Sequence, residues 1–80
     1  MHNTDRNDIY KEGQAAERIA YETVNSGDLA RAQTLFGLAS EFYRTANAPA
    51  QSKLMTYEAR CADQRIRTAN RTSAVRFYTP

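Results

Sequence analysis

The dipeptide Gly27-Asp28 constrains the fold most, because it separates two stretches in which apolar residues recur every three or four positions. Glycine readily adopts the left-handed conformation that ends a helix. An aspartate at the next position can accept hydrogen bonds from the free N–H groups of a new helix. The sequence therefore predicts that one helix ends and another begins here, and so short a connection places the two helices side by side and antiparallel.

A second break follows at Asn47-Ala48-Pro49, since proline fits the first turn of a helix and disfavours helix at the residue before it. The apolar spacing then predicts helices over residues 5–25, 28–47 and 49–70. With only 80 residues, the chain has room for one domain. We expect an all-α, three-helix antiparallel bundle over residues 1–70. A short basic aromatic tail over 71–80 would follow, as a short strand or an extended segment lying on the bundle.

The second helix is expected to be the central one, because its two apolar stripes together cover about half of its circumference. These stripes contain Leu29, Ala32, Leu35, Phe36, Leu38, Ala39, Phe42, Tyr43 and Ala46. Counting back from the turn places Ala16 of the first helix near Phe36 and Gly13 near Ala39, so that small residues face large ones. The inner side of the first helix is predicted to include Ile19, and that of the third helix is Met55, Ala59, Ala62, Ile66 and Ala69, flanked by Leu54 and Cys61.

The stretch G-D-L-A-R-A-Q-T-L-F-G-L-A resembles the turn and second helix of a tetratricopeptide hairpin. The matching positions are Gly27 and Asp28 in the turn, followed by Ala32, Phe36 and Ala39 as a small-large-small packing set. One such hairpin followed by a single third helix is similar to the three-helix microtubule-interacting-and-transport (MIT) domains, over residues 9–70. The resemblance implies binding of a peptide or helix in a groove between helices.

Residue types that carry catalysis or bind metals are scarce. His2 is the only histidine and lies in a polar terminus, and Cys61 is the only cysteine and falls on the inner flank of the third helix. Neither a catalytic triad nor a thiolate cluster can be assembled from them. We therefore expect a non-enzymatic protein without a metal or cofactor. We expect no membrane span, because no apolar run approaches the roughly 20 residues that one needs. The lone thiol fits a reducing compartment, and the polar, acidic N-terminus is unlike a signal peptide, so we expect a cytoplasmic protein.

Five residues are candidates for contact with a partner protein. Tyr10 and Tyr21 share one flank of the first helix, and tyrosine is favoured at interfaces. Gly37 lies on the polar side of the second helix, where another backbone could approach. Glu58 and Arg65 fall within the apolar arc of the third helix, either as a polar feature of a groove or as rim ion-pair residues, with Arg65 level with Glu22 and in reach of Asp28.

Charge is divided unevenly along the chain. Residues 1–52 carry a net charge of −2, whereas residues 53–80 carry +4. The third helix presents a basic stripe with seven-residue spacing, and the tail adds charge and aromatic rings of the kind that bind single-stranded nucleic acid. These residues are Lys53, Arg60, Arg67, Arg71, Arg76, Phe77 and Tyr78. The stripe is either a solvated face or a contact for nucleic acid or an acidic protein.

The sequence thus favours a small protein-binding module. It would act as an adaptor, or as an inhibitor of the kind that phages encode, by docking a helix face or interhelical groove on a larger protein. The alternative is a nucleic-acid-binding protein that uses the basic face of the third helix and the tail.

Overall fold

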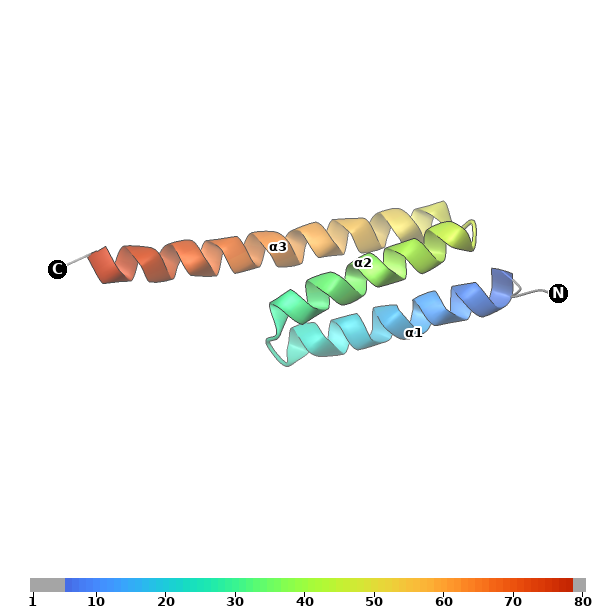
Figure 1. Cartoon of the computed structure of the whole chain (residues 1–80), viewed down its shortest axis with the longest axis horizontal. Helices are drawn as coiled ribbons and strands as arrows, with labels where there is room; N and C mark the ends of the chain where they lie inside the picture. Colours follow the sequence, from blue (N-terminus) through green and yellow to red (C-terminus); the bar gives the residue numbers. More distant parts are fainter. Residues whose placement is uncertain (1–5, 79–80) are drawn as a thin grey trace.

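The computed structural model describes the backbone of residues 6–78 and the side chains up to Arg71. Within this range the chain forms three helices and no strand: α1 (Arg6–Asn25), α2 (Leu29–Thr45) and α3 (Pro49–Tyr78). Figure 1 shows α1 and α3 running in the same direction, with α2 antiparallel to both. The predicted all-α, three-helix bundle is therefore confirmed.

Both predicted breaks end a helix through a left-handed residue. Gly27 has a φ of +92°, and its N–H donates to the carbonyl of Val24 at 3.0 Å. The Asp28 carboxylate accepts from the N–H of Arg31 at 3.1 Å, which caps α2 as predicted. The second break uses Asn47, whose φ is 61°. Asparagine tolerates this conformation better than most residues, so α2 stops there without a glycine.

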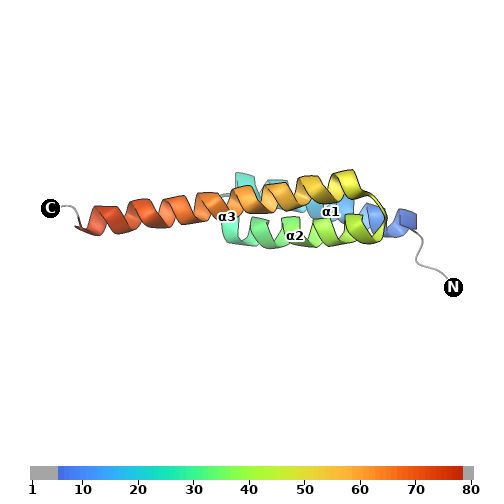
Figure 2. The same ribbon diagram turned by 90° about the horizontal axis from the view of Figure 1, so that it is seen from above.

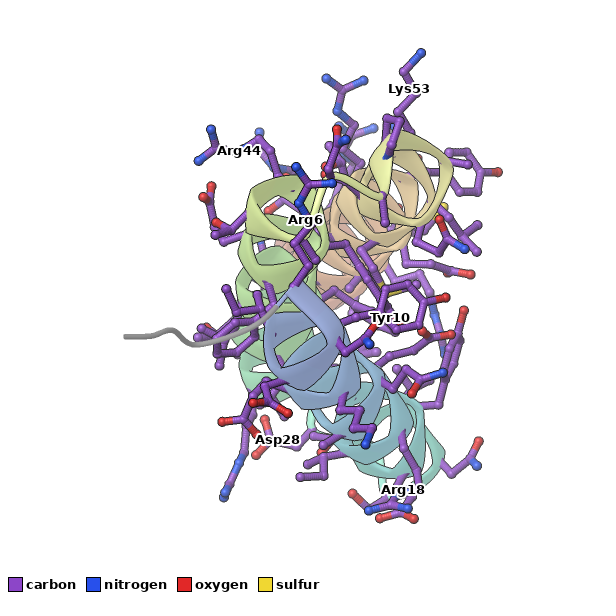
Figure 3. All side chains as sticks on the ribbon, turned by 90° about the vertical axis from the view of Figure 1, so that its right-hand side faces the viewer. Arg6, Tyr10, Arg18, Asp28, Arg44 and Lys53 are labelled. Atoms are coloured by element: carbon purple, nitrogen blue, oxygen red, sulfur yellow. The ribbon has the colours of Figure 1, made fainter. Side chains whose placement is uncertain are left out.

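The three helices occupy the corners of a triangle when viewed along their axes (Figure 3). α2 packs along both of its neighbours, whereas α1 and α3 come close to each other at only a few points. The largest fully buried side chains are Tyr43 and Phe36 of α2 and Met55 of α3. They are surrounded by small buried residues of all three helices: Gly13, Ala16, Ala20, Ala32, Ala39 and Ala62. The prediction that α2 is central is thus correct.

One contact between α1 and α2 was not predicted. A Cβ on Gly13 would lie 3.1 Å from the ring of Tyr43, so Gly13 packs against this tyrosine. Three residues assigned to apolar stripes or their flanks are also exposed: Ile19, Leu38 and Leu54. Each helix buries only the arc that faces its neighbours, and these side chains fall at or beyond the edges of those arcs.

α3 is longer than predicted. The helix continues past residue 70 to Tyr78, so residues 71–78 form neither a strand nor an extended segment. Figures 1 and 2 show this part of α3 projecting beyond the α1–α2 hairpin. The apolar period ends where the hairpin ends because nothing is left to pack against. The helical backbone continues because no glycine or proline interrupts it before Pro80.

Candidate functional site

Side chains of α1 and α3 meet on one surface of the bundle, which we call the groove, and two side-chain hydrogen bonds cross it. Near the start of α3, Gln51 Nε2 donates to the hydroxyl of Tyr10 at 3.2 Å. About two helical turns further along, the hydroxyl of Tyr21 donates to Glu58 Oε2 at 3.0 Å. In Figure 3, Tyr10 lies between α1 and α3, on the side away from α2. The two helices are therefore connected across the groove by polar side chains as well as through α2.

α2 lies beneath the groove and is covered by side chains of α1 and α3. The ring of Tyr43 is almost fully buried and meets Tyr10 edge to face, with 5.1 Å between the ring centroids. Its hydroxyl donates to Glu17 Oε1 of α1 at 2.5 Å. Burial, together with the hydrogen bond to Glu17 and the negative charge of that residue, raises the pKa of Tyr43 well above the usual tyrosine value. The Tyr43 phenol therefore stays protonated and acts as a donor.

Tyr21 lies against Phe36, also edge to face, at a centroid distance of 5.0 Å. Partial burial and the hydrogen bond to Glu58, reinforced by the charges of Glu58 and Glu17, raise the pKa of Tyr21 to about 12. More than a third of this side chain nevertheless remains accessible. Tyr21 thus combines a fixed position with an exposed aromatic edge, which suits contact with a partner.

Beside Tyr21 lies a small cavity of about 60 Å³ between α1, α2 and α3. Its polar residues are Tyr21, Glu58 and Arg65, and its apolar lining includes Phe36 and Ala62. Among the described residues Arg65 forms no ion pair, so the alternative of a rim ion pair with Glu22 or Asp28 is not observed. Glu58 accepts a hydrogen bond from Tyr21 of α1, and Arg65 remains exposed.

The structure brings together four of the five predicted contact residues. Tyr10, Tyr21, Glu58 and Arg65 all lie on the groove or its adjoining cavity. Gly37 does not belong with them. A Cβ at Gly37 would meet nothing within 4 Å, so no other segment of the described chain approaches this position, and contact with a partner there stays a prediction.

Two groove residues, Glu17 and Gln51, were not among the predicted contacts. Gln51 could have been found from spacing, because Gln51, Glu58 and Arg65 recur every seven residues along α3. Seven residues are nearly two helical turns, so such residues share one face. For Glu17 the signal was weaker: it lies between Tyr10 and Tyr21 on the same flank, but its partner Tyr43 belongs to α2 and was assigned only to the core.

The basic stripe lies on a different face of α3. Lys53, Arg60, Arg67 and Arg71 are all exposed. Arg67 Nε donates to Asp63 Oδ2 at 2.9 Å, one helical turn away. The side chains of Arg76, Phe77 and Tyr78, which were assigned to the same surface, lie outside the described residues, as does His2.

Cys61 is half-buried, which is more exposed than its predicted core position. Between Asp8 and Arg71 no three histidine, cysteine or acidic side chains gather closely enough to hold a metal ion. None of the helices within residues 6–78 combines the length and the apolar character needed to cross a bilayer.

Comparison with protein-family models, with curated protein sequences and with solved structures gave no match to this chain.

Proposed function

We propose that the chain is a non-enzymatic protein-binding module of the cytoplasm, which docks on a larger protein through the groove between α1 and α3. The observation that carries this proposal is that the two helices are spaced apart and joined by the pairs Tyr10–Gln51 and Tyr21–Glu58. A segment of another protein can lie along these polar and aromatic side chains.

Chemistry of the groove supports a peptide or helix as the occupant. Tyrosine buries a large ring while its hydroxyl keeps a polar partner, which is why it is enriched at protein interfaces. The groove also presents charges of both signs, from Glu17, Glu58 and Arg65. Groups of both signs favour a segment with mixed side chains over a polyanion. Through such docking the module would act as an adaptor or as a small inhibitor.

The hairpin resemblance described above points in the same direction, since tetratricopeptide and MIT domains are expected to bind peptides or helices between their helices. Fold-level likeness alone does not establish function. The proposal therefore depends on the groove residues and is tested on them.

A photo-crosslinking residue introduced at Gln14 tests the proposal directly, because Gln14 is exposed and lines a hollow with Glu17, Arg18 and Tyr21. In nuclease-treated lysate of the source cell we expect one discrete protein adduct, which Tyr21→Asp abolishes. The same residue at Thr34, which is exposed on α2, is the matched control and should give no such adduct. Equal labelling from both positions, or none, would reject the groove as the binding site.

Nucleic-acid binding through the basic stripe is the second candidate, because Lys53, Arg60, Arg67 and Arg71 are all exposed on α3. Four phosphate contacts would give a log–log salt dependence with a slope of about −3 to −4. Labelled single- and double-stranded oligonucleotides titrated at low and at physiological salt test this candidate. Micromolar binding at physiological salt, lost when the four residues are changed to Gln, would place this function ahead of the groove.

A further inference from the structure

α3 carries a second stripe of residues that is exposed except at the half-buried Cys61. Leu54, Tyr57, Cys61, Gln64 and Thr68 follow one another at spacings of three and four residues. This is the spacing of a coiled-coil seam. Leu54 is 46% exposed and Tyr57 is 62% exposed, although both are large and apolar. The stripe is separate from the buried positions Met55 and Ala62, through which α3 packs against the bundle.

The two large residues at the start of this seam are not isolated. Cys61 follows Tyr57 by one helical turn on the seam, and its side chain raises the pKa of the Tyr57 phenol. Beyond Cys61 the seam opens into a hollow of about 670 Å³. Leu29 and Ala69 add apolar surface to it, and Gln64 and Thr68 form its polar part. The seam is therefore a continuous surface whose two large apolar residues, Leu54 and Tyr57, lie at one end.

Charged residues flank the seam in a fixed pattern. Lys53, Arg60 and Arg67 each precede a seam residue and form one edge, and all three are exposed. Glu58 and Arg65 form the other edge. In a pair of packed helices these edge positions face the edges of the partner and determine which partner is accepted. This edge carries only basic residues, of which Arg67 is already paired with Asp63 of its own helix, and it favours a helix with acidic residues beside its own apolar stripe.

We propose that this seam of α3 binds an amphipathic helix of a partner protein, one whose apolar stripe is flanked by glutamate or aspartate. The exposed apolar residues supply the contact area, and the basic edge supplies the selectivity. The seven-residue spacing of Lys53, Arg60 and Arg67 follows from this arrangement, because each residue faces one heptad of the partner.

A second copy of the chain fits the seam poorly. In an antiparallel pair of α3 helices the edge formed by Lys53, Arg60 and Arg67 would face the same basic edge of the other copy. A parallel pair would bring Lys53 opposite Glu58 but Arg60 opposite Arg65, so one attraction is offset by one repulsion. Like charges held in register disfavour pairing. An acidic helix meets neither difficulty.

The seam also goes beyond the proposed groove: it borders the groove at Glu58 and Arg65, but its test changes no residue that bridges α1 and α3. The two proposals can therefore fail separately. Absence of the crosslink at position 14 would reject only the groove as a binding site. Failure of the peptide experiment described below would reject only the seam.

Two stapled helical peptides of three heptads, with the same leucine stripe but flanked by either Glu or Lys, are the probes. We expect the Glu-flanked peptide to bind the full chain about tenfold or more tightly than the Lys-flanked peptide in a calorimetric titration at physiological salt. The triple variant K53E/R60E/R67E should reverse this preference, and Tyr57→Asp should weaken binding of both peptides.

The matched control is K11E/R31E/R44E, which makes the same change in net charge on exposed positions of α1 and α2. It should keep the preference for the Glu-flanked peptide, which separates a local effect of the seam from an effect of overall charge. Helicity measured for each variant confirms that these exposed changes leave the fold intact.

Several outcomes would overturn the proposal. Binding of neither peptide, equal binding of both, or reversal by the control triple variant would each remove the seam as a selective helix site. Self-association that depends on Tyr57 in sedimentation velocity would assign the seam to a second copy. Tight binding of an oligonucleotide that K53E/R60E/R67E abolishes would assign the basic edge to nucleic acid.

Discussion

The hydroxyl of Tyr43 on α2 donates to Glu17 Oε1 on α1 at 2.5 Å, beneath the groove between α1 and α3. The ring of Tyr43 is almost fully buried, while Glu17 is half-buried and reaches the groove wall. One hydrogen bond thus joins the hydrophobic core to the candidate site. Changes to it should alter both the stability of the bundle and the position of the Glu17 carboxylate.

Tyr43→Phe should lower the free energy of unfolding by about 1–2 kcal/mol, because the half-buried Glu17 carboxylate loses a donor while the ring keeps its packing. For a domain of this size the change corresponds to a fall in Tm of roughly 5–10 °C. Glu17→Gln is the control, since it retains an acceptor for the tyrosine and should cost less. A Tm within a degree of the wild type for Tyr43→Phe would show that the bond adds nothing to stability.

Alkaline pH should unfold the bundle through its tyrosines. The pKa of Tyr21 is about 12 in the folded chain, against an ordinary value of 10.0, and the pKa of Tyr43 is raised as well. A raised pKa means that the folded state holds its phenol proton more tightly. The stabilisation is complete below pH 10 and is lost as pH rises toward 12.

Urea titrations between pH 9 and pH 12 measure this loss. The double variant Tyr21→Phe/Tyr43→Phe should show a shallower decline over this range, because these two phenols no longer titrate. Tyr57→Phe is the comparison variant, since Tyr57 is far more exposed than either. A decline of unchanged steepness in the double variant would show that other groups dominate alkaline unfolding.

Gly37 and Gly13 should respond oppositely to alanine. Gly37→Ala adds a Cβ to a helix at a site with nothing within 4 Å, so it should stabilise by about 0.5–1 kcal/mol. Gly13→Ala places its Cβ 3.1 Å from the ring of Tyr43 and 3.3 Å from Phe42 Cβ. Overpacking of this kind costs about 1–3 kcal/mol, which exceeds the gain in helix propensity.

Thermal melts of the two glycine variants, measured at equal concentration, should therefore shift in opposite directions from the wild-type Tm. Stabilisation by both alanines would mean that the Tyr43 ring moves aside without cost. Destabilisation by Gly37→Ala would point to a requirement for glycine on the open face of α2.

Phe36→Ala should cost about 3–5 kcal/mol, enough to unfold much of so small a domain. Phe36 is 1% exposed at the centre of α2, and its ring meets that of Tyr21 edge to face. Chemical denaturation monitored by helicity measures the loss. Leu38→Ala, on the same helix but 47% exposed, is the matched control and should cost much less. Similar losses for both would contradict the central role of Phe36.

Turn residues made the helix order predictable. Gly27, Asp28 and Pro49 each act through local chemistry, which depends on neighbours in the chain and hardly at all on tertiary packing. The large core residues could be predicted for a related reason, because Phe36 and Tyr43 lie at the centre of an apolar arc and remain buried for any modest rotation of α2.

Residues at the edges of those arcs could not be placed from sequence. Whether Ile19 or Leu54 is buried depends on how far each helix rotates toward its neighbours, and this rotation is fixed by packing such as that of Gly13 on Tyr43. For α3, the loss of apolar spacing after residue 70 wrongly predicted the end of the helix. It marked only the end of the partner helices.

Candidate groove residues were predictable where a polar side chain interrupts an apolar arc, as Glu58 and Arg65 do. Their partners were not, because a hydrogen bond between Tyr21 and Glu58 depends on the relative height of α1 and α3 along the bundle. A shift of a single helical turn, about 5.4 Å, would replace every partner across the groove.

The projecting end of α3 gives the molecule the proportions of a rod, with principal extents of 64 × 20 × 16 Å. Its radius of gyration is 15.9 Å, whereas a compact chain of this length would have about 12 Å. A rod diffuses more slowly than a sphere of equal mass, so a single copy will elute early from a gel-filtration column and resemble a dimer. Mass from light scattering, and not elution volume, therefore has to decide how many copies are present.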